Sequence, residues 1–65
     1  DKAKGVAALG GTVVGVIDDS PDTLEALRDA NVPTWAMARP YNEHVADVPR
    51  VDSVTEWAAA VAGRL

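Results

Sequence analysis

The chain has 65 residues, of which 48% are hydrophobic and 25% charged, and this composition predicts one small, marginally stable domain over residues 1–65. It has no cysteine and a single histidine, which excludes a disulfide framework and zinc sites built from Cys or several His, so any metal must bind through oxygen. The net charge of −4 disfavours binding to a nucleic-acid backbone, and without an 18-residue apolar segment or a signal-peptide pattern we expect a cytoplasmic protein with no membrane partner.

The first half of the chain reads as helix, strand and helix. Residues 2–9 have helical spacing of their apolar residues, and we expect a short helix that ends at the glycine pair after it. Residues 12–17 form a β-branched apolar run, which is typical of a parallel strand covered on both faces. Ser20 and Pro21 then predict the start of a helix that continues to Ala30, because serine caps helix N-termini and proline suits the first helical position.

The second half reads as strand, loop and helix. Residues 32–38 predict a second strand, parallel to the first, and residues 50–51 allow a very short third one. Ser53 and Glu56 match a capping box and predict a closing helix. Its expected apolar face consists of Val54, Trp57, Ala58, Val61 and Leu65. The fold class is therefore α/β: a minimal doubly wound, Rossmann-like α-β-α-β-α unit with a two- or three-stranded parallel sheet.

Two adjacent carboxylates, Asp18 and Asp19, end the first strand directly before the helix start. Ligands of open α/β sheets bind where the carboxyl ends of strands meet the amino ends of helices. Arg39 and Asn42 follow the second strand and therefore reach the same edge of the sheet. The alternative is structural: acids at a helix N-terminus are stabilised by the helix dipole by about 0.3–1 kcal/mol without any ligand.

Taken in order, these segments resemble the C-terminal part of the haloacid dehalogenase-like (HAD) phosphohydrolases, in particular their deoxyribonucleotidase-like branch. The matching segments are Lys2, residues 16–21 (VIDDSP), residues 39–42 (RPYN) and the stretch from Arg50-Val51 to Trp57. The match covers nearly the whole chain, and its specificity comes from the order of the segments.

The resemblance implies a magnesium cofactor held by Asp18 and Asp19. Magnesium takes hard oxygen ligands and often only one or two carboxylates, with water and phosphate completing its coordination. It also implies that Lys2, or the less well placed Lys4, neutralises a phosphate group. The phosphate- or ligand-binding residues on this interpretation are Lys2, Arg39 and Asn42.

The family's nucleophile motif, Asp-x-Asp, does not occur in the sequence, and we assign no catalytic residue. We therefore expect a truncated HAD-like domain without autonomous catalysis, which acts as a binding or interaction module with a vestigial magnesium and phosphate site. The alternative is the C-terminal portion of a magnesium-dependent phosphohydrolase, similar to a 5'-nucleotidase, that is active only with a separate N-terminal half. A third interpretation treats the acidic turn as incidental and the protein as a homodimer or a phage-type accessory protein.

The expected partners are accordingly a second copy of the chain or a complementary protein half. Trp35 and Trp57 both fall in apolar patterns on predicted elements, so we expect them in the core rather than on a binding surface. The alternative is that one of them is exposed, because so small a sheet can hardly bury both. An apolar patch of this kind, together with an edge strand, favours dimerisation.

Overall fold

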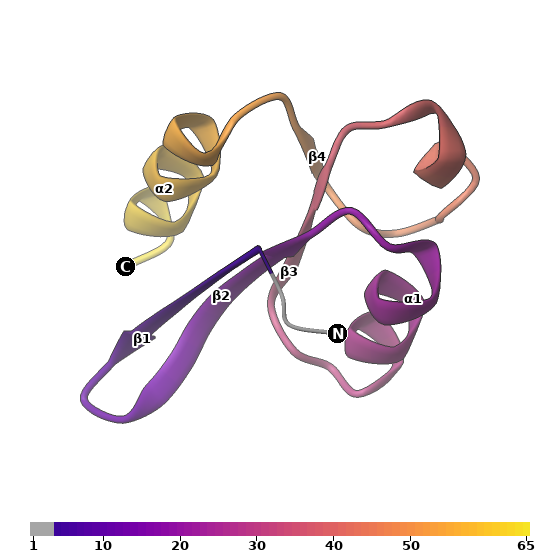
Figure 1. The fold of residues 1–65 in the computed structure, drawn as a ribbon. Coiled ribbons are helices and arrows are strands. Elements are labelled where there is room, and N and C mark those ends of the chain that lie inside the picture. Colours follow the sequence, from indigo (N-terminus) through magenta and orange to yellow (C-terminus); the bar gives the residue numbers. More distant parts are fainter. Residues whose placement is uncertain (1–3) are drawn as a thin grey trace.

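The computed structural model describes residues 4–65, which form a four-stranded mixed sheet with two α-helices (Figure 1). The strands are β1 (Gly5–Leu9), β2 (Thr12–Asp18), β3 (Thr34–Met37) and β4 (Arg50–Val51). The helices are α1 (Pro21–Asp29) and α2 (Val54–Gly63), and a short 3-10 helix, η1 (Pro40–Asn42), follows β3. The strand order is β1-β2-β3-β4, with β1 antiparallel to β2 and the other neighbours parallel.

The parallel part of the sheet confirms the central prediction of a strand, a helix and a second strand. The register of β2 and β3 pairs Ile17 with Trp35 and Asp18 with Ala36, so the two strands end close together. The very short third strand over residues 50–51 is also confirmed as β4. The carboxyl ends of β2, β3 and β4 therefore lie at one edge of the sheet, where the candidate site was predicted.

The predicted helix over residues 2–9 is wrong where the structure describes it, because residues 5–9 form β1. Gly10 and Gly11 have φ angles of 58° and 83°, and two consecutive left-handed residues make the tight turn of a β-hairpin rather than a helix C-cap. The element order is therefore two strands, helix, two strands and helix in place of α-β-α-β-α. The sheet accordingly has four strands of mixed direction, not two or three parallel ones.

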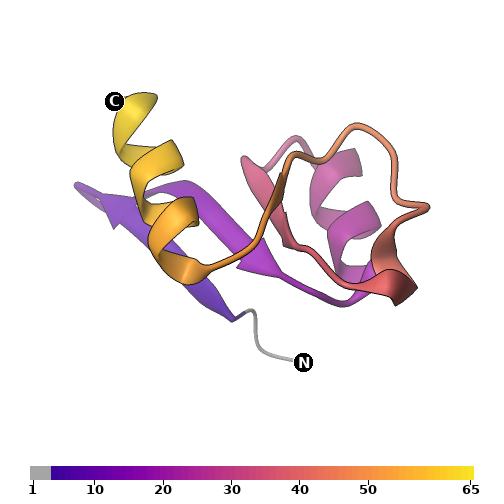
Figure 2. The ribbon, with the colours of Figure 1, turned by 90° about the horizontal axis from the view of Figure 1, so that it is seen from above.

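The two α-helices cover opposite faces of the sheet, as the view from above shows (Figure 2). Successive side chains of β3 alternate between these faces. The core beneath α2 contains Ile17, Trp35, Met37, Val51, Trp57 and Val61. The smaller core on the α1 face contains Leu24, Ala36, Val45 and Val48.

Both tryptophans belong to the core beneath α2, which confirms that they are core residues and overturns the alternative that one is exposed. Trp35 is 4% exposed and Trp57 is 8% exposed. Two glycines of the hairpin make the room: a Cβ added at Gly5 would lie 3.2 Å from the ring of Trp57, and one at Gly15 would lie 3.1 Å from the ring of Trp35. Strand residues without side chains thus let a small sheet bury two large indoles.

The apolar face predicted for the closing helix is confirmed only in part. Trp57 and Val61 are buried, whereas Ala58 is exposed, Val54 is 51% exposed and Leu65 is 71% exposed. The helix ends at Gly63 and meets a narrow sheet, so only the residues on its central stripe reach the core. In the described part of the chain, neither helix has the length and apolar character that a membrane crossing requires.

Candidate functional site

Asp18, the last residue of β2, has two carboxylate oxygens in different environments. The side chain is 3% exposed, and its Oδ1 accepts hydrogen bonds from the backbone N–H groups of Asp19 and Ser20, both at 2.8 Å. This turn leads the chain into α1, whose first residue is Pro21. No donor among residues 4–65 reaches Oδ2, although that oxygen is buried. Since an unpaired buried acceptor is costly, Oδ2 is the atom of this edge most suited to a cation.

Asp19, by contrast, is engaged by donors from two distant segments. The hydroxyl of Tyr41 donates to its Oδ2, and Nζ of Lys4 lies 3.8 Å from the same oxygen. Lys4 reaches this point because β1 is antiparallel to β2: the pairing of Gly5 with Ile17 places the residue before β1 beside the end of β2. The hairpin thus brings a cation to the acidic edge.

The electrostatics at this edge stabilise the ionised form of Asp19. The hydrogen bond from the Tyr41 hydroxyl, helped by the charges of Lys4 and Arg39, holds the pKa of Asp19 below its usual value. The same hydrogen bond raises the pKa of Tyr41, because the phenol proton is held by the carboxylate. Asp19 therefore carries its negative charge next to two positive side chains, a mixed environment that can hold a cation and an anion together.

Asn42 fixes the loop that carries Tyr41. Its side chain is fully buried, and its Nδ2 donates to the backbone carbonyl oxygens of Asp19 at 3.0 Å and Met37 at 2.8 Å. Its Oδ1 accepts from the backbone N–H of Arg39 at 3.1 Å and from the guanidinium of Arg50 at 2.8 Å. Both donors and both lone pairs of the amide are thus used within the chain. Asn42 therefore positions the site, while its own polar atoms are already satisfied.

Of the residues that the sequence singled out, the structure brings Asp19, Arg39 and Asn42 together. Within residues 4–65, the carboxylate of Asp18 accepts hydrogen bonds only from the backbone of Asp19 and Ser20.

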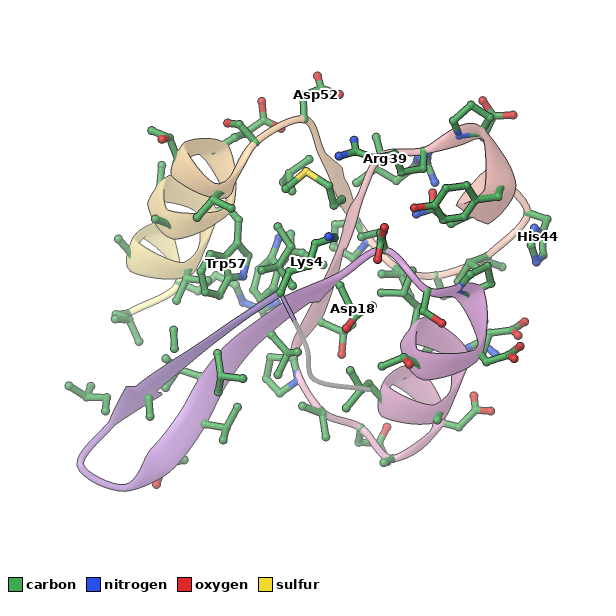
Figure 3. All side chains as sticks on the ribbon, in the orientation of Figure 1. Lys4, Asp18, Arg39, His44, Asp52 and Trp57 are labelled. Atoms are coloured by element: carbon green, nitrogen blue, oxygen red, sulfur yellow. The ribbon has the colours of Figure 1, made fainter. Side chains whose placement is uncertain are left out.

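Figure 3 shows Lys4 and Arg39 on one side of the chain at the end of β2, Asp18 on the other side, toward α1, and His44 further away on the loop after η1. Lys2, the preferred phosphate-side cation of the sequence prediction, lies outside the described residues, and Lys4 is the lysine found at the site.

Two features of the site were not predicted as such, the contact of Lys4 and the hydrogen bond of Tyr41. The signal for Lys4 was present in the sequence, because two glycines between two apolar runs are typical of a hairpin, and the hairpin register then places this lysine. The hydrogen bond between Tyr41 and Asp19 spans 22 positions and had no local signal.

The described residues at this edge supply carboxylate oxygens but no closely grouped set of metal ligands. Among residues 4–65, no three His, Cys, Asp or Glu side chains gather closely enough to hold a metal ion by themselves. The chain offers the free Oδ2 of Asp18 and the carboxylate of Asp19. This donor set fits magnesium, which is commonly held by one or two carboxylates while water and phosphate oxygens provide the remaining ligands.

A cavity of about 360 Å³ lies at the opposite end of the strands, away from the acidic edge. It is lined by residues from the last turn of α1 to the start of β3, by residues before β4 and by one near the end of the chain, among them Asn31, Pro33, Pro49 and Arg64. The candidate site is therefore separate from this cavity.

In comparisons with known proteins, no family model, curated protein or solved structure matches the chain.

Proposed function

We propose that the chain is a HAD-like α/β module that binds a magnesium ion and a phosphate group at the carboxyl edge of its parallel strands and has no catalytic activity by itself. The observation that carries the proposal is the buried, unpaired Oδ2 of Asp18, whose neighbour in the chain, Asp19, contacts Lys4. The sheet with helices on both faces is compatible with a minimal Rossmann-like unit, and we propose this classification of the fold. We also propose that the protein is cytoplasmic.

The roles follow from the chemistry of the side chains. Asp18 and Asp19 would hold the magnesium ion, whose chemical contribution is to polarise a phosphoryl oxygen. Lys4 and Arg39 supply positive charge for the phosphate group on the same edge. Asn42 keeps the loop in place through its four hydrogen bonds. The sequence lacks the Asp-x-Asp nucleophile motif, which is why we propose binding without turnover.

The test is a magnesium titration of the isotopically labelled chain, followed through the backbone amides of residues 17–22 by NMR. We expect saturable shifts at these amides, first with magnesium and then with magnesium plus a nucleoside monophosphate. In Asp18→Asn the amide oxygen can still accept the two hydrogen bonds of the turn, but the charge is lost, so the magnesium Kd should rise about tenfold or more.

Asp22→Asn is the matched control, because Asp22 is an exposed acid in the first turn of the same helix. It should leave the magnesium Kd nearly unchanged. If the wild-type chain is folded and shows no shift at millimolar magnesium, the binding proposal is wrong. Magnesium-dependent hydrolysis of p-nitrophenyl phosphate that disappears in Asp18→Asn would contradict the statement that the chain has no activity by itself.

A second candidate is that the chain acts as the C-terminal portion of a magnesium-dependent phosphohydrolase together with a separate N-terminal half. The observation in its favour is the outer strand β1, where Val6 is 59% exposed and Leu9 is 62% exposed. Exposed apolar residues on an edge strand suit a protein partner, either this half or a second copy of the chain. Co-expression with a candidate half should give a stable complex with magnesium-dependent phosphatase activity, and the absence of both would count against this candidate.

A further inference from the structure

The two adjacent carboxylates of the site, those of Asp18 and Asp19, differ in their hydrogen-bond partners. Oδ2 of Asp18 has no donor among the described residues. Oδ2 of Asp19 receives the hydroxyl of Tyr41 and lies 3.8 Å from Nζ of Lys4. The pair therefore has one buried oxygen without a donor and one oxygen that is already engaged by the chain's own donors.

The loop beneath Tyr41 is fixed by several hydrogen bonds, whereas the Tyr41 side chain is half exposed and donates a single hydrogen bond, to Asp19. Asn42 ties the loop to Asp19 and Met37, and the guanidinium of Arg50 braces it through the carbonyl oxygens of Asn42 and Arg39. Tyr41 itself is 52% exposed. Its side chain can therefore turn away from Asp19 without any movement of the backbone that holds the site together.

The donors on Asp19 compete directly with a metal ion. The hydrogen bond uses a lone pair of the carboxylate, and the nearby ammonium group offsets its negative charge. Both weaken the binding of a cation, because magnesium needs direct contact with its oxygen ligands. Phosphoryl oxygens, however, are strong acceptors for both a hydroxyl and an ammonium group. A phosphate group at this edge would attract the donors of Lys4 and Tyr41 and leave Asp19 free for the cation.

We propose that Lys4 and Tyr41 form a latch on Asp19 that couples the two ligands, so that magnesium and a phosphate group bind together more tightly than either binds alone. The latch rests on the proposed function, since it presumes that Asp18 and Asp19 hold the metal. By linkage, the factor by which phosphate increases magnesium affinity equals the factor by which magnesium increases phosphate affinity.

The experiment measures the magnesium Kd from the amides of residues 17–22, with and without a fixed concentration of inorganic phosphate, for the wild type and three variants. In the wild type, phosphate should lower the magnesium Kd at least about threefold, as expected when it frees one charge-assisted hydrogen bond. Tyr41→Phe keeps the ring and removes the hydroxyl, so it should bind magnesium at least about threefold more tightly without phosphate and gain less from phosphate.

Lys4→Met provides an independent variant at an exposed position and should behave in the same direction. His44→Ala, an exposed residue of the same loop region, is the matched control and should have the wild-type values. If the folded wild type and variants all fail to bind magnesium, the proposed function fails. If the wild type binds magnesium but Tyr41→Phe and Lys4→Met have its Kd, or phosphate does not lower that Kd, the latch is wrong while the magnesium site stands.

Discussion

At the scale of single residues, Gly15 shows how closely the core beneath α2 is packed. A Cβ at this position would lie 2.7 Å from Cγ2 of Val61 and 3.1 Å from Cζ3 of Trp35. Valine has little rotational freedom in a helix, and both neighbours are buried. Trp35 can therefore be buried, and α2 can pack closely on the sheet, only because residue 15 has no side chain.

We expect Gly15→Ala to destabilise the protein by about 1–3 kcal/mol, because the added methyl group overpacks the core. Chemical denaturation followed by far-UV circular dichroism measures this change. Gly63→Ala is the matched control, since no atom lies within 4 Å of a Cβ added there and alanine is the better helix former. Its stability should be unchanged or higher by up to about 1 kcal/mol, and an equal loss in both variants would contradict the packing argument.

Much of the candidate site could be predicted residue by residue. Asp18 and Asp19 stand out in the sequence because a β-branched run ends at them and a helix signal follows at once. What the sequence could not indicate is that one carboxylate keeps a free oxygen while the other is engaged by Tyr41 and Lys4. That difference depends on segments that approach only when the sheet has formed.

At the scale of secondary-structure elements, both α-helices have a serine at the N-cap position, but only one of the two serines makes a capping hydrogen bond. Oγ of Ser53 accepts a hydrogen bond from the backbone N–H of Glu56 at 3.0 Å, and the Glu56 carboxylate accepts from the N–H of Asp52 at 3.1 Å. The predicted capping box is therefore confirmed only in part: Ser53 caps the helix, but the Glu56 carboxylate binds the N–H of Asp52 rather than that of Ser53. Ser20 stands at the start of α1 as predicted, but its side chain makes no capping hydrogen bond.

Ser53→Ala should consequently cost about 1 kcal/mol of stability, since it leaves a helix N–H without its acceptor. Ser20→Ala should change the free energy of unfolding by less than about 0.5 kcal/mol, because the backbone N–H that donates to Asp18 is retained. Thermal or urea denaturation of the two variants side by side distinguishes them. Equal destabilisation would mean that Ser20 caps α1 in solution.

The first element is where prediction from periodicity was wrong. Small residues dominate residues 5–9, and alanine and glycine fit a helical and an extended pattern almost equally well. The extended structure is favoured over a helix by the turn at Gly10 and Gly11 and by the space that Gly5 and Ala7 leave under α2. Local propensity was weak here, so tertiary packing decided the structure.

At the scale of the whole molecule, two small cores share one sheet. Both tryptophans lie on the α2 face, while Leu24, which is fully buried, belongs to the core on the α1 face. Neither core is large enough to be stable alone in a chain of 65 residues, for which a total stability of about 3–10 kcal/mol is typical. We therefore expect the two faces to unfold together.

Leu24→Ala should lower stability by about 2–5 kcal/mol, a large share of the total. Because unfolding is cooperative, the near-UV circular dichroism of Trp35 and Trp57 should be lost in the same transition as the far-UV signal, although Leu24 lies in the other core. A tryptophan signal that keeps its wild-type midpoint while the far-UV signal of the variant shifts would show that the two faces unfold independently.

The sequence by itself determined the parallel strands, the helix starts and the acidic end of β2, because these follow from apolar runs, proline and capping residues that act over a few positions. The tertiary structure decided the hairpin of β1, the burial of both tryptophans and the contacts of Lys4 and Tyr41 with Asp19. These features depend on which segments become neighbours across the sheet, and that is set by long-range packing and register rather than by local propensity.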